Sequence, residues 1–156
     1  MKKLCIAFTI LLLLSFKVVA GEISGVANII DGDTIKILKK SIRFYGIDAP
    51  EKKQKCIKNY KKYNCGQAAT DALIKKIQGK QVICKVQKKL DRYKRYIGIC
   101  FIEKIDINKW LVRSGYAVAY KKYSKDYIGD EKYANKNKLG LWSGSFTRPE
   151  KWRKLN

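Results

Sequence analysis

Five short runs of β-branched residues, divided into three and two by one helical segment, limit the folds that this chain can adopt. The expected strands span residues 22–30, 34–38, 42–47, 81–86 and 96–101. Ala69, Leu73 and Ile77 recur at helical spacing in the segment between the two groups. They predict a helix over 67–77 that ends near Gly79. Three strands, a helix and two strands is the order of the Greek-key barrel known as the OB-fold.

Two helical segments follow the last expected strand. One covers 107–114 and stops at Gly115, and the other runs from about 126 to 138 and ends near Gly140. The segment 51–64 is polar and rich in lysine, a composition typical of a loop. We therefore expect an α+β protein, a five-stranded OB-fold Greek-key β-barrel with about three helices.

The first twenty residues have the organisation of a secretory signal peptide. Lys2 and Lys3 give a basic start, residues 4–16 are apolar, and small residues precede Gly21. An uncleaved membrane anchor is the alternative, but thirteen apolar residues fall short of the roughly 20 that span a bilayer. We expect cleavage after Ala20, a secreted or periplasmic location, and a single domain over residues 21–156.

The mature chain would be strongly basic. Without the three lysines of the signal peptide, 32 basic residues stand against 13 acidic ones, a net charge of +19. Such a surplus attracts polyanions and makes their association fast and salt-dependent. For an exported protein the candidate polyanions are nucleic acid, anionic lipid and acidic polysaccharide. Lysine pairs such as 52–53, 61–62 and 121–122 fit this general attraction better than they fit specific contacts.

The cysteines agree with export. The mature chain keeps an even number of them, Cys56, Cys65, Cys84 and Cys100, as is common in an oxidising compartment. Cys84 and Cys100 are each eight residues from Arg92, in the polar turn between two expected strands. If those strands form a hairpin, the two thiols face each other, so we favour Cys84–Cys100 and therefore Cys56–Cys65. A zinc site is the alternative, but the spacing contains no Cys-x-x-Cys pair.

The scarce acidic residues concentrate in two segments, 31–34 and 43–51, which hold four of the thirteen. Asp33 would begin the second strand and Asp48 would end the third, so antiparallel pairing would bring the two carboxylates together. Two carboxylates with a main-chain carbonyl and water form an oxygen-only site for Ca²⁺ or Mg²⁺ rather than for zinc. Because the chain has no histidine, hydrolysis would have to use carboxylates, arginines and a hard metal ion.

Glu51 and two arginines complete a set suited to phosphodiester hydrolysis. Glu51 follows Asp48 across a rigid turn at Pro50 and can take a proton from water. Arg43 and Arg95 carry permanent, fork-shaped charges that hold phosphate oxygens and offset charge in the transition state. Each feature alone has an ordinary explanation, because Asp-Gly is a common hairpin turn and arginines are common on basic surfaces. Their joint occurrence at this spacing favours a catalytic site.

In these motifs the chain resembles the staphylococcal nuclease, or thermonuclease-like, family. The shared pattern comprises Asp31-Gly32-Asp33-Thr34, the segment from Arg43 to Glu51, Asp91-Arg92-Tyr93-Lys94-Arg95 and Gly140-Leu141-Trp142. It extends over nearly all of the mature chain. The resemblance implies an OB-fold barrel with helices and Ca²⁺-dependent cleavage of DNA and RNA. It also implies that the bond to the 5′ oxygen breaks, which leaves 3′-phosphate ends.

The resemblance assigns roles to individual residues. The calcium ligands would be the carboxylates of Asp33 and Asp48 and the main-chain carbonyl of Ala49. The catalytic residues would be Arg43, Glu51 and Arg95, with Glu51 as the general base and the arginines on the phosphate. Two positions depart from the family pattern: Ala49 replaces a threonine, which matters little for a carbonyl ligand, and Lys94 replaces a glycine that precedes the second arginine. If that glycine needs a positive φ, the turn before Arg95 must adjust.

Several tyrosines are expected near the turns of this site: Tyr93, Tyr116, Tyr120, Tyr123 and Tyr127. A tyrosine ring can stack on any base, which suits a nuclease without sequence preference. The core is the better interpretation for Tyr116. The resemblance places Tyr93 and Tyr123 beside the nucleotide and Arg92 near the terminal phosphate.

The expected function is a secreted, calcium-dependent nuclease that acts on DNA and RNA. It would be a monomer without stable membrane association after signal cleavage. A nucleic-acid-binding module without catalysis is the alternative, because the same fold binds nucleic acid in relatives that have lost these residues. A cationic membrane toxin is a weaker third possibility. Such a toxin needs an exposed amphipathic helix, and the final expected helix carries the acids Asp126, Asp130 and Glu131.

Overall fold

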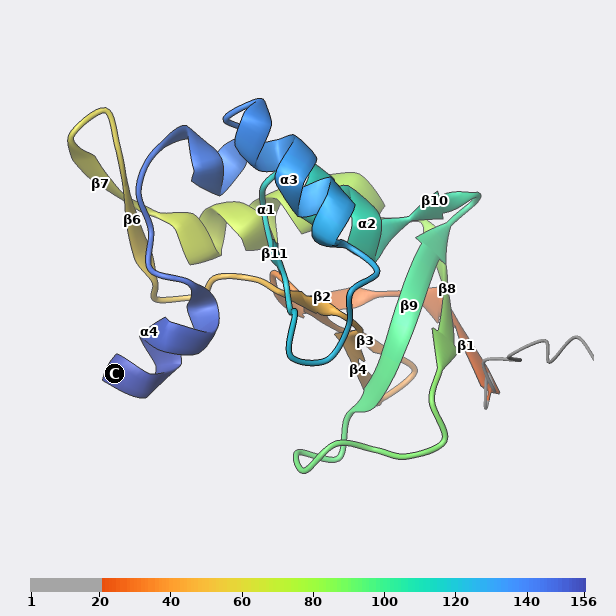
Figure 1. Cartoon of the computed structure of the whole chain (residues 1–156). Helices are drawn as coiled ribbons and strands as arrows, with labels where there is room; N and C mark the ends of the chain where they lie inside the picture. The colour runs from red at the N-terminus through yellow and green to blue at the C-terminus, as the bar shows by residue number, and fades with distance from the viewer. Residues whose placement is uncertain (1–20) are drawn as a thin grey trace, which may run out of the picture.

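The computed structural model describes residues 21–156. It has a mixed α+β architecture built on one main sheet (Figure 1). In hydrogen-bonding order, the strands are β1 (Gly21–Val26), β8 (Gln81–Val86), β9 (Tyr96–Ile102), β4 (Lys40–Phe44), β3 (Thr34–Ile37) and β2 (Asn28–Asp31), with β10 (Ile105–Asp106) beside β9. All neighbours pair antiparallel except β4 and β9, which are parallel. The expected signal peptide lies outside the described residues.

The first expected strand, 22–30, is divided in two. β1 pairs with β8, whereas β2 pairs with β3, and the buried residue Ala27 separates them. The reason is geometric: the segment reaches two different neighbours, so the backbone must turn between them. The two ends of the sheet path are therefore consecutive pieces of one stretch of chain.

Four α-helices and one 3-10 helix occur among the described residues, one α-helix more than expected. They are α1 (Cys65–Ile77), α2 (Ile107–Arg113), α3 (Ile128–Lys136), η1 (Gly140–Ser143) and α4 (Pro149–Leu155). The expectation missed α4 because its seven residues are mostly charged and show no apolar periodicity. It begins with Pro149 in the first turn, where proline suits a helix. No helix within residues 21–156 has the length and apolar character needed to cross a bilayer.

The core lies between the main sheet and the helices α1 and α2. Ile35 and Ile42 are completely buried on the sheet, Leu73 of α1 and Leu111 of α2 are equally buried, and all four belong to one apolar cluster. This packing fixes the positions of β3 and β4, whose ends carry the acidic segments.

The segment 51–64 contains a β-hairpin, so its assignment to a loop was wrong. Strands β6 (Lys55–Lys58) and β7 (Lys61–Asn64) pair antiparallel as a separate two-stranded sheet. The disulfide Cys56–Cys65 joins β6 to the start of α1. Backbone hydrogen bonds between Ile57 and Ser145, both 2.9 Å, add a further support. The hairpin could not be predicted from composition, because it is held by a covalent bond and backbone contacts and not by an apolar face.

The hairpin formed by β8 and β9 confirms the expected symmetry about residue 92. Cys84 is the direct partner of Cys100, and the two form a disulfide with a Cα–Cα distance of 4.0 Å. Both expected disulfides are therefore present.

Candidate active site

Asp33 lies in the tight turn between β2 and β3, where the sheet path ends. Its amide donates to the Asp31 carboxylate at 3.0 Å, which holds the turn. Asp33 is 2% exposed, and its carboxylate accepts a hydrogen bond from the hydroxyl of Thr34 at 3.2 Å. The turn thus points one buried carboxylate towards the neighbouring chain segment.

Asp48 reaches the same place from β5 (Ile47–Asp48), which pairs with β11 (Val118–Ala119). Its carboxylate is also buried, since the residue is 1% exposed. The next amide, that of Ala49, donates to Asp33 Oδ2 at 2.7 Å. This bond ties the end of β5 to the β2–β3 turn.

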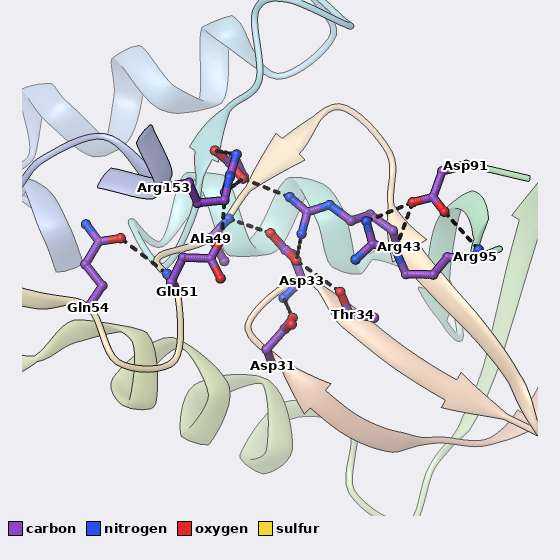
Figure 2. Close-up of polar contacts among 11 residues, drawn as sticks. Asp31, Asp33, Thr34, Arg43, Ala49, Glu51, Gln54, Asp91, Arg95 and Arg153 are labelled. Atoms are coloured by element: carbon purple, nitrogen blue, oxygen red, sulfur yellow. Dashed lines mark hydrogen bonds and ion pairs between the residues drawn. The ribbon is translucent and has the colours of Figure 1, made fainter. Parts of the chain in front are cut away.

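Arg43 connects the two carboxylates (Figure 2). It lies on β4 directly opposite Thr34, so the register of the β3–β4 pair brings it beside Asp33. Its Nη1 donates to Asp33 Oδ1, and its Nη2 donates to Asp48 Oδ1 at 2.8 Å. Burial alone would lower the pKa of the Arg43 guanidinium, but the nearby carboxylates outweigh burial and raise it. The two acids therefore lie within the span of one guanidinium.

Glu51 is held by its backbone and leaves its carboxylate accessible. Its amide donates to Gln54 Oε1 at 3.2 Å, and its carbonyl accepts from the Gln54 amide at 2.7 Å. Gln54 is fully buried and donates its side-chain amide to the Thr147 carbonyl at 2.6 Å. A Cβ added to Gly66 would come within 1.8 Å of the Glu51 carbonyl, so α1 packs directly on this turn. The Glu51 side chain is 34% exposed.

Arg153 of α4 is a member of this group that the sequence interpretation missed. Its guanidinium donates to both oxygens of Asp48, at 2.9 and 3.1 Å, and to Glu51 Oε1 at 2.7 Å (Figure 2). Burial would lower the pKa of Arg153, but its bonds to these two carboxylates raise it. No local pattern identifies this residue, because it is one of many basic residues and lies 105 positions from Asp48.

Arg95 lies on a second side of the site, in the turn that precedes β9. The Asp91 carboxylate accepts from the Arg95 amide at 2.9 Å and from the guanidinium at 2.8 Å. Lys94, which stands where the resemblance predicts a glycine, adopts a φ of 60° itself. A lysine can hold this left-handed conformation at a modest cost, and the turn forms around Asp91. Arg95 makes its ion pair with Asp91 rather than with the Asp33–Asp48 pair.

A cleft of about 1420 Å³ opens over these residues. Arg43, Glu51, Arg95 and Arg153 all contribute to its walls. So do the three residues expected to contact the nucleotide, Arg92, Tyr93 and Tyr123. Tyr93 and Tyr123 are 62% and 60% exposed, so their rings are available for stacking. Tyr127 belongs to the core cluster, and Tyr116 packs against that cluster.

The donor set determines which metal ion would fit this site. Burial raises the pKa of the Asp33 carboxyl to about 7, although Arg43 acts in the opposite direction. A nearby positive charge stabilises the ionised form of such a buried carboxyl group. The available ligands are carboxylate and main-chain oxygens, which suit Ca²⁺ or Mg²⁺. Within residues 21–156 no group of three or more His, Cys, Asp or Glu side chains could hold a metal, so such an ion would draw further ligands from the main chain, water and phosphate.

The fold and the site together define a small α+β protein with a carboxylate–arginine cluster beside a basic cleft. Comparison with known families assigns it further: residues 41–144 match the family described as Staphylococcal nuclease homologue. The chain belongs to the staphylococcal nuclease family, which confirms the resemblance seen in the motifs. Arg43, Asp48, Glu51 and Arg95 lie within the matched range, whereas Asp33 and Arg153 lie outside it.

Individual relatives cover most of the chain. "Succinoglycan biosynthesis protein ExoI" of Rhizobium meliloti (strain 1021) is 35% identical over 127 residues, 79% of this chain and 66% of that protein. An "Uncharacterized endonuclease" of Escherichia coli O157:H7 is 32% identical over 142 residues, 86% of each chain. "Micrococcal nuclease" of Shigella flexneri is 30% identical over 169 residues, 97% of this chain and 91% of that protein. This chain thus spans just under two thirds of the ExoI protein and most of the other two.

Proposed function

We propose that this protein is a calcium-dependent nuclease that hydrolyses phosphodiester bonds of DNA and RNA without sequence preference and leaves 3′-phosphate ends. The observation that carries the proposal is the cluster of Asp33, Arg43, Asp48 and Glu51, in which Arg43 and Glu51 line a basic cleft and the two aspartates are buried beside them. Membership of the staphylococcal nuclease family supports it.

In this proposal each residue has one task. Glu51, the most accessible of the three carboxylates, accepts a proton from the water that attacks phosphorus. The bond between phosphorus and the 5′ oxygen breaks, and that oxygen leaves with a proton from solvent. Arg43 and Arg95 hold the non-bridging oxygens and offset the negative charge that develops on them. Tyr93 and Tyr123 stack on the bases, and Arg92 contacts a flanking phosphate.

Asp33, Asp48 and the Ala49 carbonyl would hold the calcium ion, which supplies positive charge to the scissile phosphate when bound. In the structure Arg43 and Arg153 donate to the same carboxylates. The proposal therefore requires Arg153 to share Asp48 with the ion or to move towards Glu51 or the phosphate.

We also propose that the main sheet forms the OB-fold barrel of the family and that residues 21–156 act as one exported domain. Support for the barrel comes from β1 and β2, which end the sheet path on opposite sides and yet follow each other in the chain. Support for export comes from the two disulfides, which persist in oxidising compartments.

Plasmid DNA and an RNA, each incubated with purified protein and calcium or with a chelator, test the proposal. We expect degradation only with calcium, and end-group analysis should find 3′-phosphate termini. Binding without degradation in either condition would favour the non-catalytic module. Products with 5′-phosphate ends would contradict the proposed bond cleavage.

A further inference from the structure

The hairpin of β6 and β7 carries an unusual concentration of positive charge. Six lysines, all of them exposed, occur between residues 52 and 62: Lys52, Lys53, Lys55, Lys58, Lys61 and Lys62. No acidic residue occurs from 52 to 70. Across the part of the chain that the structure describes, none of these six lysines forms an ion pair. Uncompensated like charges at this density repel one another, and a bound polyanion would relieve this repulsion.

The tip of the hairpin exposes an aromatic ring that the fold does not need. Asn59 and Tyr60 form the two-residue turn, with φ values of 49° and 62°. Two positive φ values define a type I′ turn, for which Asn-Gly is the favoured pair. Tyr60 adopts a left-handed conformation that is unfavourable for a residue with a side chain, and it is fully exposed. The ring therefore serves neither the turn nor the core.

The hairpin is held firmly at its base, so it can present these groups in a fixed position. The Cys56–Cys65 disulfide joins it to α1, and paired backbone bonds join Ile57 to Ser145. A Cβ on Gly144 would approach the Ile57 carbonyl to 1.9 Å, so a glycine is required for this close contact. A preorganised arm loses little conformational freedom when a ligand binds.

The position of the hairpin relates it to the cleft. The chain enters β6 only four residues after Glu51. Figure 1 shows the hairpin projecting from the body on the same side as α4, which carries Arg153 on the wall of the cleft. A strand of four residues extends about 13 Å, and Tyr60 at the tip is not among the residues that line the cleft.

We propose that the β6–β7 hairpin is a second nucleic-acid contact, which binds a single-stranded segment of the substrate outside the cleft. Its lysines hold the phosphates, and the Tyr60 ring stacks on an unpaired base. Stacking on an exposed ring needs an accessible base face, which favours single-stranded over duplex nucleic acid. The choice of nucleic acid as the ligand rests on the proposed function.

Binding of fluorescent single-stranded oligonucleotides of about 20 and about 4 nucleotides, measured in a chelator, tests this contact without cleavage. The charge variant is Lys58→Gln/Lys61→Gln/Lys62→Gln. Its matched control, Lys75→Gln/Lys132→Gln/Lys136→Gln, removes the same charge from exposed lysines on α1 and α3. On the long oligonucleotide, the charge variant should reduce the salt dependence by about 2 logarithmic units per decade, since each phosphate contact contributes about 0.7. The control should change it much less.

Tyr60→Gly separates the ring from the charge. It should weaken binding of the long oligonucleotide by about five-fold or more, the lower end of what a stacked base contributes. The melting temperature should stay the same or rise, because glycine suits the type I′ turn. Neither hairpin variant should differ from wild type on the short oligonucleotide, which cannot reach both sites.

Equal losses in the hairpin and control variants would overturn the proposal, because the effect would then be one of net charge alone. Unchanged oligonucleotide binding in Tyr60→Gly would also overturn it. So would a Tyr60→Gly variant that loses binding to vesicles containing phosphatidylserine but binds the oligonucleotide as wild type does. Failure of the proposed nuclease activity has a different signature: no degradation with calcium, while the hairpin variants still weaken binding.

Discussion

Replacing Arg153 with alanine should strengthen calcium binding. The Arg153 guanidinium donates to both carboxylate oxygens of Asp48, at 2.9 and 3.1 Å. These are the oxygens that the proposed ion would use, and Ca²⁺ binds such oxygens at about 2.3–2.6 Å. The two cations would therefore compete for one carboxylate, and the arginine would have to give up part of its bonding before the ion binds.

The magnitude follows from these contacts and from their exposure. A net hydrogen bond to a charged group contributes about 1.5–3 kcal/mol when it is well buried. Arg153 is 34% exposed and retains its 2.7 Å bond to Glu51, so only part of that energy is lost. A competition of about 1–2 kcal/mol corresponds to a rise in calcium affinity of about 5- to 30-fold in Arg153→Ala.

Calorimetric titration of calcium into chelator-treated protein, without nucleic acid, measures this affinity directly. Lys154→Ala is the matched control, because it removes the same charge from α4 and from the cleft wall, and Lys154 pairs with Glu150 at 3.5 Å rather than with Asp48 or Glu51. Arg153→Lys should fall between wild type and Arg153→Ala, since lysine keeps the charge but not the two-pronged contact. Equal or weaker binding in Arg153→Ala than in Lys154→Ala would refute the competition.

The remaining predictions concern the acids. Glu51→Gln should reduce single-turnover cleavage by about 10²- to 10⁴-fold, while oligonucleotide binding is largely preserved; wild-type rates would remove Glu51 from the role of base. Asp33→Ala should raise the calcium concentration required for activity or abolish activity, and an unchanged calcium titration would argue against a ligand role. Glu131→Gln should lower the free energy of unfolding by about 2 kcal/mol at pH 7, because Glu131 accepts bonds from Arg148 and from the Ala119 amide. Burial alone would raise the pKa of Glu131, but these bonds lower it, so its stabilisation is present above about pH 4.5 and is lost as the pH falls through the folded-state value. Urea unfolding of both proteins from pH 7 to pH 3 should therefore show a difference that shrinks in acid, and a constant difference would contradict this.

Features determined by nearby residues could be predicted from the sequence. The Cys84–Cys100 disulfide followed from the equal distance of both cysteines from one polar turn, because a hairpin with a defined turn has a defined register. The helix α1 followed from apolar spacing, and the end of α2 followed from the stop at Gly115. The Asp33 turn followed from Asp-Gly, and the structure places that turn beside Asp48 through the Ala49 amide.

Features held by distant contacts could not be predicted in the same way. The β6–β7 hairpin has no alternation of apolar and polar residues, and its supports are a disulfide and a backbone pairing with Ser145. The helix α4 is short and charged, and Arg153 finds its partner far away along the chain. In a chain with 35 basic residues, one more arginine near the end carries no signal of its own.

The placement of Arg153 nevertheless has a definite cause within the fold. Asp48 lies on β5, which pairs with Val118 of β11. The next residue, Ala119, donates its amide to Glu131 at 2.8 Å and accepts a bond from Arg148 at 3.1 Å. Arg148 also donates to Glu131 at 2.9 Å and immediately precedes α4. One buried carboxylate therefore fixes both the strand beside Asp48 and the start of the helix that carries Arg153. The C-terminal helix is thus docked onto the same pair of strands that positions the acid, which explains how a residue outside the region matched to the family comes to share its site.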